Sequence, residues 1–122
     1  MKKLLCAFLV AASLLLFSCG TTEKVKKPYE WDNYTMATYN YVKVPNDETL
    51  QSLLATYQRI MDGQNSENVY RNTVPPGVCA DYGYMLILAG KTDEGKALLL
   101  KEKELYPESA VFIERVLEMV ER

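Results

Sequence analysis

The first nineteen residues decide how much of this chain is available to fold. Two lysines, Lys2 and Lys3, precede a run from Leu4 to Phe17 that contains no charged residue. This layout is typical of a secretory signal peptide, and the run is shorter than the about 20 apolar residues that a transmembrane helix needs. We therefore predict that residues 1–18 are a signal peptide, which is removed and forms no part of the fold.

The residues around the predicted cleavage point resemble a lipobox. The aliphatic Leu16 stands three positions before Cys19, and the small Ser18 stands directly before it. The resemblance implies that Cys19 becomes the first residue of a bacterial lipoprotein, with a diacylglyceryl group on its thiol. Such proteins carry two or three acyl chains, which give stable membrane attachment. An ordinary signal peptide that happens to end near a cysteine is the alternative.

The segment after Cys19 indicates a location. Gly20 follows it, and the aspartate that retains enterobacterial lipoproteins in the inner membrane is missing. We therefore expect the bacterial outer membrane. The segment 19–28 is polar and ends at Pro28, so we predict a flexible tether. It lacks the acidic run of some surface-exported lipoproteins, which favours the periplasmic face.

The remaining residues, 29–122, suit one small domain that packing alone must stabilise. Of the three cysteines, Cys6 leaves with the signal peptide and Cys19 is lipidated, so Cys79 has no partner for an intramolecular disulfide. Cys79 lies in an apolar stretch without a neighbouring cation. We therefore expect a buried, unreactive thiol.

Proline, glycine and asparagine divide the domain into segments with helical periodicity, which predicts an all-α fold. Five helices are expected. The first spans about residues 32–43, the second lies between Asn46 and Gly63, the third between Val74 and Gly90, the fourth between Thr92 and Pro107, and the fifth follows Ser109. We expect Asn46 or Asp47, Thr92 and Ser109 to cap their helices, and Pro75 and Pro76 to lie in a first turn.

The short connections predict two antiparallel hairpins and a C-terminal capping helix. The second hairpin resembles a tetratricopeptide repeat, because Gly83, Gly90, Leu99 and Pro107 stand at the offsets of that repeat's packing glycine, turn glycine, core residue and closing proline. Glu102 departs from the repeat, which usually has a small alanine there. The first hairpin is predicted to be a degenerate tetratricopeptide-like unit.

Longer runs resemble one family more specifically. The runs are Trp31 with Tyr34, Val74-Pro75-Pro76-Gly77, Gly83-Tyr84, Gly90-Lys91-Thr92-Asp93, and Glu102-Lys103-Glu104-Leu105-Tyr106-Pro107-Glu108-Ser109 with Phe112. They are similar to small lipoproteins of domain-of-unknown-function family 4810. That family has no assigned activity. Its members typically occur beside a curli-secretion-type, CsgG-like lipoprotein, which implies an envelope assembly.

Composition argues against enzymatic, metal-dependent and nucleic-acid-binding classes. The chain contains no histidine, so Ser-His-Asp and Cys-His constellations are excluded and the commonest metal ligand is missing. There is no basic stripe for nucleic acid. Glu102, the one carboxylate on an apolar stripe, is expected to pair with a lysine or arginine of a neighbouring helix. We expect no catalytic residues, no cofactor and no metal.

An aromatic group at the start of the domain is the candidate binding surface. Five rings are more than one face of a short helix can bury, so some are expected to be exposed. They are Tyr29, Trp31, Tyr34, Tyr39 and Tyr41. Tyr29, Trp31, Tyr34 and Tyr41 are the candidate partner-binding residues, and core packing is the alternative. Two functions remain: an adaptor that binds an envelope protein, such as the CsgG-like lipoprotein, or a module that binds peptidoglycan or another glycan.

Overall fold

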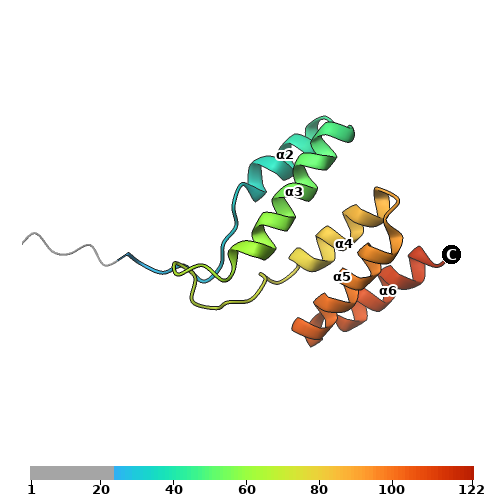
Figure 1. Ribbon diagram of the computed structural model, residues 1–122. Coiled ribbons are helices and arrows are strands. Elements are labelled where there is room, and N and C mark those ends of the chain that lie inside the picture. Colours follow the sequence, from blue (N-terminus) through green and yellow to red (C-terminus); the bar gives the residue numbers. More distant parts are fainter. Residues whose placement is uncertain (1–23) are drawn as a thin grey trace, which may run out of the picture.

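The computed structural model describes residues 24–122, and this part of the chain is built from helices (Figure 1). The helices are α2 (Tyr34–Lys43), α3 (Asp47–Gly63), α4 (Val78–Leu88), α5 (Thr92–Leu105) and α6 (Ala110–Val120), with one turn of 3-10 helix, η2 (Pro107–Ser109), before α6. The predicted all-α class is confirmed. None of the described helices is long and apolar enough to cross a membrane. The predicted signal peptide and Cys19 lie outside the described residues.

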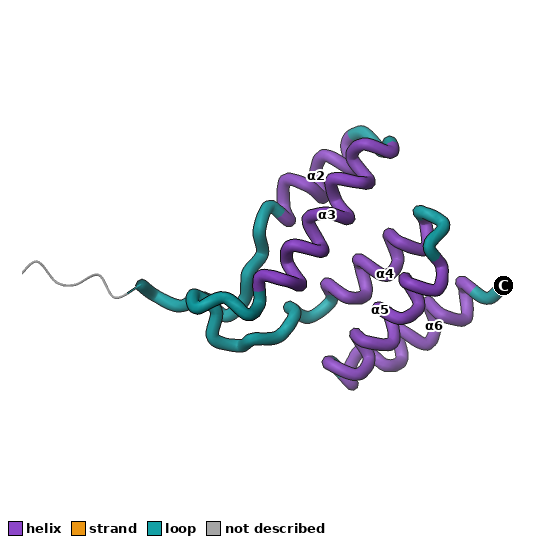
Figure 2. The backbone as a smooth tube through the Cα atoms, viewed as in Figure 1, coloured by secondary structure: helices purple, strands orange, loops and turns teal. Residues whose placement is uncertain are grey.

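The helices form two antiparallel hairpins and a final helix that packs beside the second hairpin (Figure 1). The first hairpin is α2 with α3, and the second is α4 with α5. Figure 2 shows that a long loop joins the two hairpins, whereas tight turns join the helices within each of them. α2, α4 and α6 run in the same direction, so their N-terminal ends lie at the same end of the domain. This is the arrangement that the sequence predicted.

One predicted helix start is confirmed and another differs in detail. Asn46 caps α3 through a capping box, because its side chain accepts from the Thr49 amide at 2.9 Å and Thr49 Oγ1 accepts from the Asn46 amide at 3.2 Å. The prolines Pro75 and Pro76 do not lie in the first turn of α4, as predicted, but precede the helix. Gly77 intervenes at the N-cap with a left-handed φ of 88°, a conformation that glycine adopts without steric cost.

The other predicted side-chain caps are wrong. Thr92 is the first helical residue of α5, and Lys91 occupies the cap position without a side-chain hydrogen bond. Ser109 stands at the N-cap of α6, but its hydroxyl donates to the Tyr106 carbonyl at 2.7 Å and caps nothing in α6. A tight 3-10 turn at η2 supplies the change of direction instead.

The core has two parts. The first lies between the hairpins and is centred on Leu53, Tyr57, Ile60, Val78 and Cys79. The second lies between the α4–α5 hairpin and α6 and contains Ala80, Leu99, Ile113 and Val116. The predicted burial of Cys79 is confirmed, since this residue is 0% exposed. α6 therefore covers one side of the second hairpin, as expected of a capping helix.

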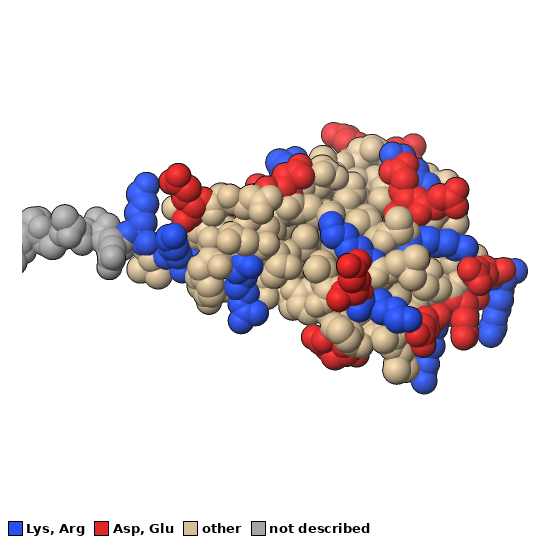
Figure 3. Space-filling view, turned by 60° about the horizontal axis from the view of Figure 1, so that its bottom comes forward, with Lys and Arg blue, Asp and Glu red and all other residues tan. Residues whose placement is uncertain are grey.

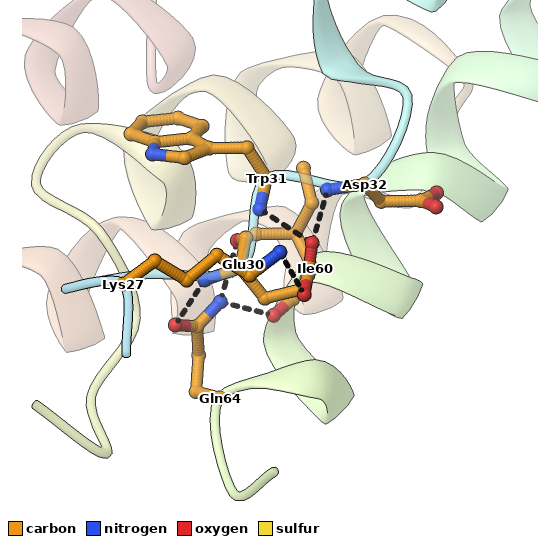
Figure 4. Close-up of polar contacts among 6 residues, drawn as sticks. All are labelled: Lys27, Glu30, Trp31, Asp32, Ile60 and Gln64. Carbon is orange, nitrogen blue, oxygen red and sulfur yellow. Dashed lines mark hydrogen bonds and ion pairs between the residues drawn. The ribbon is translucent and has the colours of Figure 1, made fainter. Parts of the chain in front are cut away.

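An N-terminal strap, residues 27–32, binds the end of α3 and the loop after it. Lys27 forms a parallel bridge with Val69, although the sequence assigned Lys27 to the flexible tether. The buried Gln64 donates to the carbonyls of Glu30 at 2.8 Å and Ile60 at 2.6 Å, and it accepts from the Glu30 amide at 3.1 Å (Figure 4). Arg59 pairs with Asp32 at 2.7 Å. These contacts fix the strap to the domain.

Charge on the surface is mixed. Figure 3 shows basic side chains, with acidic atoms next to them, near the grey trace where the described chain begins, and both signs interspersed at the opposite end. An uncharged area separates them on this face. No single-sign field dominates the face in view, which agrees with the absence of a basic stripe in the sequence.

Candidate functional site

Three of the predicted aromatic residues, Tyr29, Trp31 and Tyr34, begin a continuous row of rings. Ring centroids lie 6.4 Å apart between Tyr29 and Trp31, 5.5 Å between Trp31 and Tyr34, and 5.9 Å between Tyr34 and Tyr57. Tyr82 of α4 stacks on Tyr57 at 5.4 Å. The row starts in the strap and ends inside the first core. It joins the predicted residues of the strap and α2 to α3 and α4.

The row is only partly available to a ligand. Trp31 is 42% exposed, whereas Tyr34 and Tyr41 pack against the first core. Tyr29 is half-buried, and its hydroxyl accepts from Arg71 Nη1 at 3.0 Å. Of the four candidate partner-binding residues, Trp31 therefore presents the most accessible ring, and Tyr34 and Tyr41 also contribute to packing.

Tyr34 connects this row to a second feature on α4. Its hydroxyl donates to Asp81 Oδ2 at 3.2 Å. Desolvation raises the pKa of Asp81, and this hydrogen bond partly offsets the shift. Desolvation and the Asp81 charge together raise the pKa of Tyr34. The Asp81 carboxyl group is therefore partly desolvated, although the residue as a whole is exposed.

A groove between α4 and α6 begins at Asp81. This α4–α6 groove has a volume of about 230 Å³ and is lined by Ala80, Asp81, Tyr84, Leu99, Phe112, Val116 and Met119. Its buried floor is part of the second core. Its walls are open to solvent, since Tyr84 is 42%, Phe112 61% and Met119 63% exposed. Large apolar side chains on both walls thus stand in water above an apolar floor.

The groove adjoins an acidic cavity at the start of α6. This acidic cavity measures about 340 Å³ and shares Ala80, Asp81 and Phe112 with the groove. Its further lining includes Gly77, Glu102, Tyr106 and Glu108. It therefore lies between the N-terminal end of α4, the C-terminal end of α5 and the η2 turn.

Glu102 is the most unusual residue of the acidic cavity. It is 2% exposed and carries a carboxylate in the second hairpin's interior. Oε1 accepts from the Gly77 amide at 2.7 Å, whereas Oε2 is buried and has no hydrogen-bond partner. The predicted ion pair with a lysine or arginine is wrong. The carboxylate instead accepts a hydrogen bond at the N-terminal end of α4, where the helix dipole favours negative charge.

Two findings describe the chemistry of the candidate groups in the described part of the chain. The described residues contain no group of three residues able to hold a metal ion. Burial raises the pKa of the Cys79 thiol to about 11, so its thiolate is scarce at neutral pH. The arrangement is suited to binding, with an apolar groove, an acidic end and exposed aromatic rings.

Sequence reasoning missed most of the α4–α6 groove. Phe112 was named as part of the family resemblance; its spacing to Ile113 and Val116 is typical of a buried helix face, but Phe112 is exposed. Tyr84 and Met119 were assigned to no face. The available signal was the size and apolar character of these three side chains, but the sequence alone does not show that they stay exposed. Glu102 was recognised as unusual, because a carboxylate interrupts an apolar stripe.

Comparison with known proteins adds a family. The family model described as "Domain of unknown function (DUF4810)" matches residues 29–116. No curated protein and no solved structure shows significant similarity to the chain. The match covers the strap from Tyr29, both hairpins and most of α6, which includes nearly all residues of the α4–α6 groove. The chain therefore belongs to the DUF4810 family.

Proposed function

We propose that this protein is a lipid-anchored, non-enzymatic adaptor that binds another protein of the cell envelope through the α4–α6 groove. The observation that carries the proposal is the exposure of Tyr84, Phe112 and Met119 on the two walls of one groove. Large apolar side chains that stand in water next to one another mark interaction surfaces. Aromatic residues above an apolar floor are also typical of the residues that dominate protein–protein binding.

The proposed anchor places this surface near a membrane. Lipid on Cys19 would hold the chain at the outer membrane, on its periplasmic face. The strap begins eight residues after Cys19, and a fully extended segment of that length reaches at most about 30 Å. The domain would then meet other membrane-attached proteins more often than freely diffusing ones. The CsgG-like lipoprotein that the family resemblance implies as a neighbour is the first partner to test.

The proposal is tested by two matched substitutions. Phe112→Ser removes a wall of the groove, whereas Leu100→Ser removes a leucine that is 54% exposed on α5 and outside the groove. The full-length protein is purified from envelopes in mild detergent, and copurifying proteins are quantified. We expect Phe112→Ser to reduce the partner at least tenfold without lowering the melting temperature. Equal recovery with both variants would contradict the proposal.

Glycan binding is the second candidate function, and Trp31 supports it. Trp31 is 42% exposed, and the rings of Tyr29 and Tyr34 both pack near its indole. A fixed, exposed indole is suited to stack on a sugar ring. Binding of the full chain to isolated peptidoglycan, lost in Trp31→Ala and kept in Phe112→Ser, would favour this function over the adaptor.

A further inference from the structure

The acidic cavity has a one-sided charge. The charged residues that line it are Asp81, Glu102 and Glu108, and its lining includes no lysine or arginine. The nearby Lys103 is already paired with Glu114 at 2.6 Å. Three acidic residues thus line one cavity, and no lysine or arginine of its own walls balances their charge.

Glu102 has an unused acceptor in the wall of this cavity. Gly77 satisfies Oε1, and the buried Oε2 lacks a hydrogen-bond partner. A buried carboxylate oxygen without a donor is unfavourable, and such atoms are rare in native proteins. A donor from outside the chain would complete the site. A cationic donor would also neutralise the excess negative charge.

We propose that the acidic cavity binds the side-chain ammonium or guanidinium group of a lysine or arginine. The cation donates to Glu102 Oε2, with Asp81 and Glu108 supplying further negative charge. Tyr106 and Phe112 also line the cavity and provide aromatic rings, which attract cations. The identification of the source as a protein rests on the function proposed above. Because the cavity and the groove share Asp81 and Phe112, the matching partner segment has a basic residue beside apolar ones.

Small probes test the cavity without a known partner. The probes are the N-acetyl methylamides of lysine and arginine, with the glutamine compound as the neutral control. Binding is followed by nuclear magnetic resonance on the full chain in detergent micelles. The Gly77 amide is the reporter, because it donates directly to Glu102. We expect saturable shifts with the lysine or arginine probe, and affinity at least tenfold weaker for the glutamine probe.

Matched substitutions assign the binding to Glu102. Glu102→Gln keeps an oxygen for the Gly77 amide and removes the charge, so we expect at least a tenfold loss of affinity for the cationic probe. Glu104→Gln alters an exposed carboxylate on the same helix, outside the cavity, and should leave the affinity unchanged. Asp81→Asn should weaken binding severalfold and serves as a second variant if Glu102→Gln proves unstable. Helical circular dichroism verifies the fold of each variant.

Two results would overturn the inference. One is equal binding of the lysine, arginine and glutamine probes. The cavity would then show no preference for a cation, and a water molecule would be the partner of Oε2. The other is unchanged affinity in Glu102→Gln and Asp81→Asn. These outcomes are separate from the proposed function. A protein partner lost in Phe112→Ser, together with no cation binding, would keep the adaptor and remove only the cation site.

Discussion

Gly83 of α4 and Gly95 of α5 face each other backbone to backbone. A Cβ atom added at Gly83 would lie 2.6 Å from the Gly95 carbonyl oxygen, and one added at Gly95 would meet the Gly83 carbonyl and Ile87. The two helices therefore approach so closely that neither position accepts a side chain without a shift. This contact explains the packing glycine of the tetratricopeptide-like pattern. It also explains why position 95, like position 83, is a glycine.

We predict that Gly83→Val lowers the free energy of unfolding by about 1–3 kcal/mol or more, because the new side chain forces the helices apart. Ala97→Val is the matched control, since Ala97 is exposed on α5. That change should cost less than about 1 kcal/mol through helix propensity alone. Chemical denaturation followed by circular dichroism measures both. Similar losses in the two variants would mean that the close contact is unimportant.

Acid should release the strap before the helices unfold. The Lys27 hydrogen bond lowers the pKa of Glu30, and the Arg59 hydrogen bond lowers that of Asp32. Because both values are below those of the unfolded chain, their stabilisation is complete above about pH 5 and is lost as the pH falls through the lowered values. Acid has the opposite effect on stability through Asp81, because its pKa is raised and protonation therefore favours the folded state.

The single tryptophan, Trp31, reports on the strap. Its emission should shift to longer wavelength as the pH falls below about 4, while the helical circular dichroism stays constant. The paired carboxylates are partly exposed, so the expected loss is below about 1 kcal/mol for each. The double variant Glu30→Gln with Asp32→Asn should remove the transition, and the exposed Glu67→Gln should retain it. A transition that persists in the double variant would exclude these carboxylates.

The Cys79 thiol should be inert in the folded protein. It is fully buried, and burial raises its pKa to about 11. We expect iodoacetamide at pH 8 to label it at least about a hundredfold more slowly in the folded protein than in guanidinium chloride, because reaction requires opening. Peptide mapping by mass spectrometry assigns the label. Rapid labelling of the folded chain would show that the first core is loosely packed.

The sequence predicted much of the fold because its helix boundaries have local causes. Asn46 and Gly90 act through their own neighbours: Asn46 caps α3, and Gly90 adopts a φ of 82° just after α4. The Gly90 and Lys91 amides then donate to the Ile87 and Leu86 carbonyls, which completes the helix end. Such features can be recognised without knowledge of the tertiary structure.

The candidate sites were harder to predict, since they depend on contacts between distant residues. Phe112 belongs to an apolar helix face, and only the position of α6 against the second hairpin leaves it exposed. The partner of Glu102 is the amide of Gly77, a backbone group that no side-chain pattern reveals. Similarly, the pairing of Lys27 with Val69 joins two segments of irregular structure. Periodicity carries no information about such pairs.

Lipid attachment is a separate prediction, from residues outside the described part of the chain. We expect cells that produce this protein to incorporate labelled palmitate into it and the mature chain to begin at Cys19. Cys19→Ser should abolish the label, the cleavage and the fractionation with membranes. A mature protein that remains soluble, or membrane attachment that survives Cys19→Ser, would disprove the lipoprotein assignment.

The most direct test of the adaptor is photocrosslinking in living cells. A benzophenone amino acid replaces Phe112 in the α4–α6 groove, and in a second strain it replaces Leu100 on α5, which is similarly exposed. We predict a discrete protein adduct from position 112 and none from position 100. Mass spectrometry should identify the crosslinked partner as a membrane-attached envelope protein. No adduct from position 112, equal adducts from both positions, or an adduct with glycan alone would contradict the adaptor function.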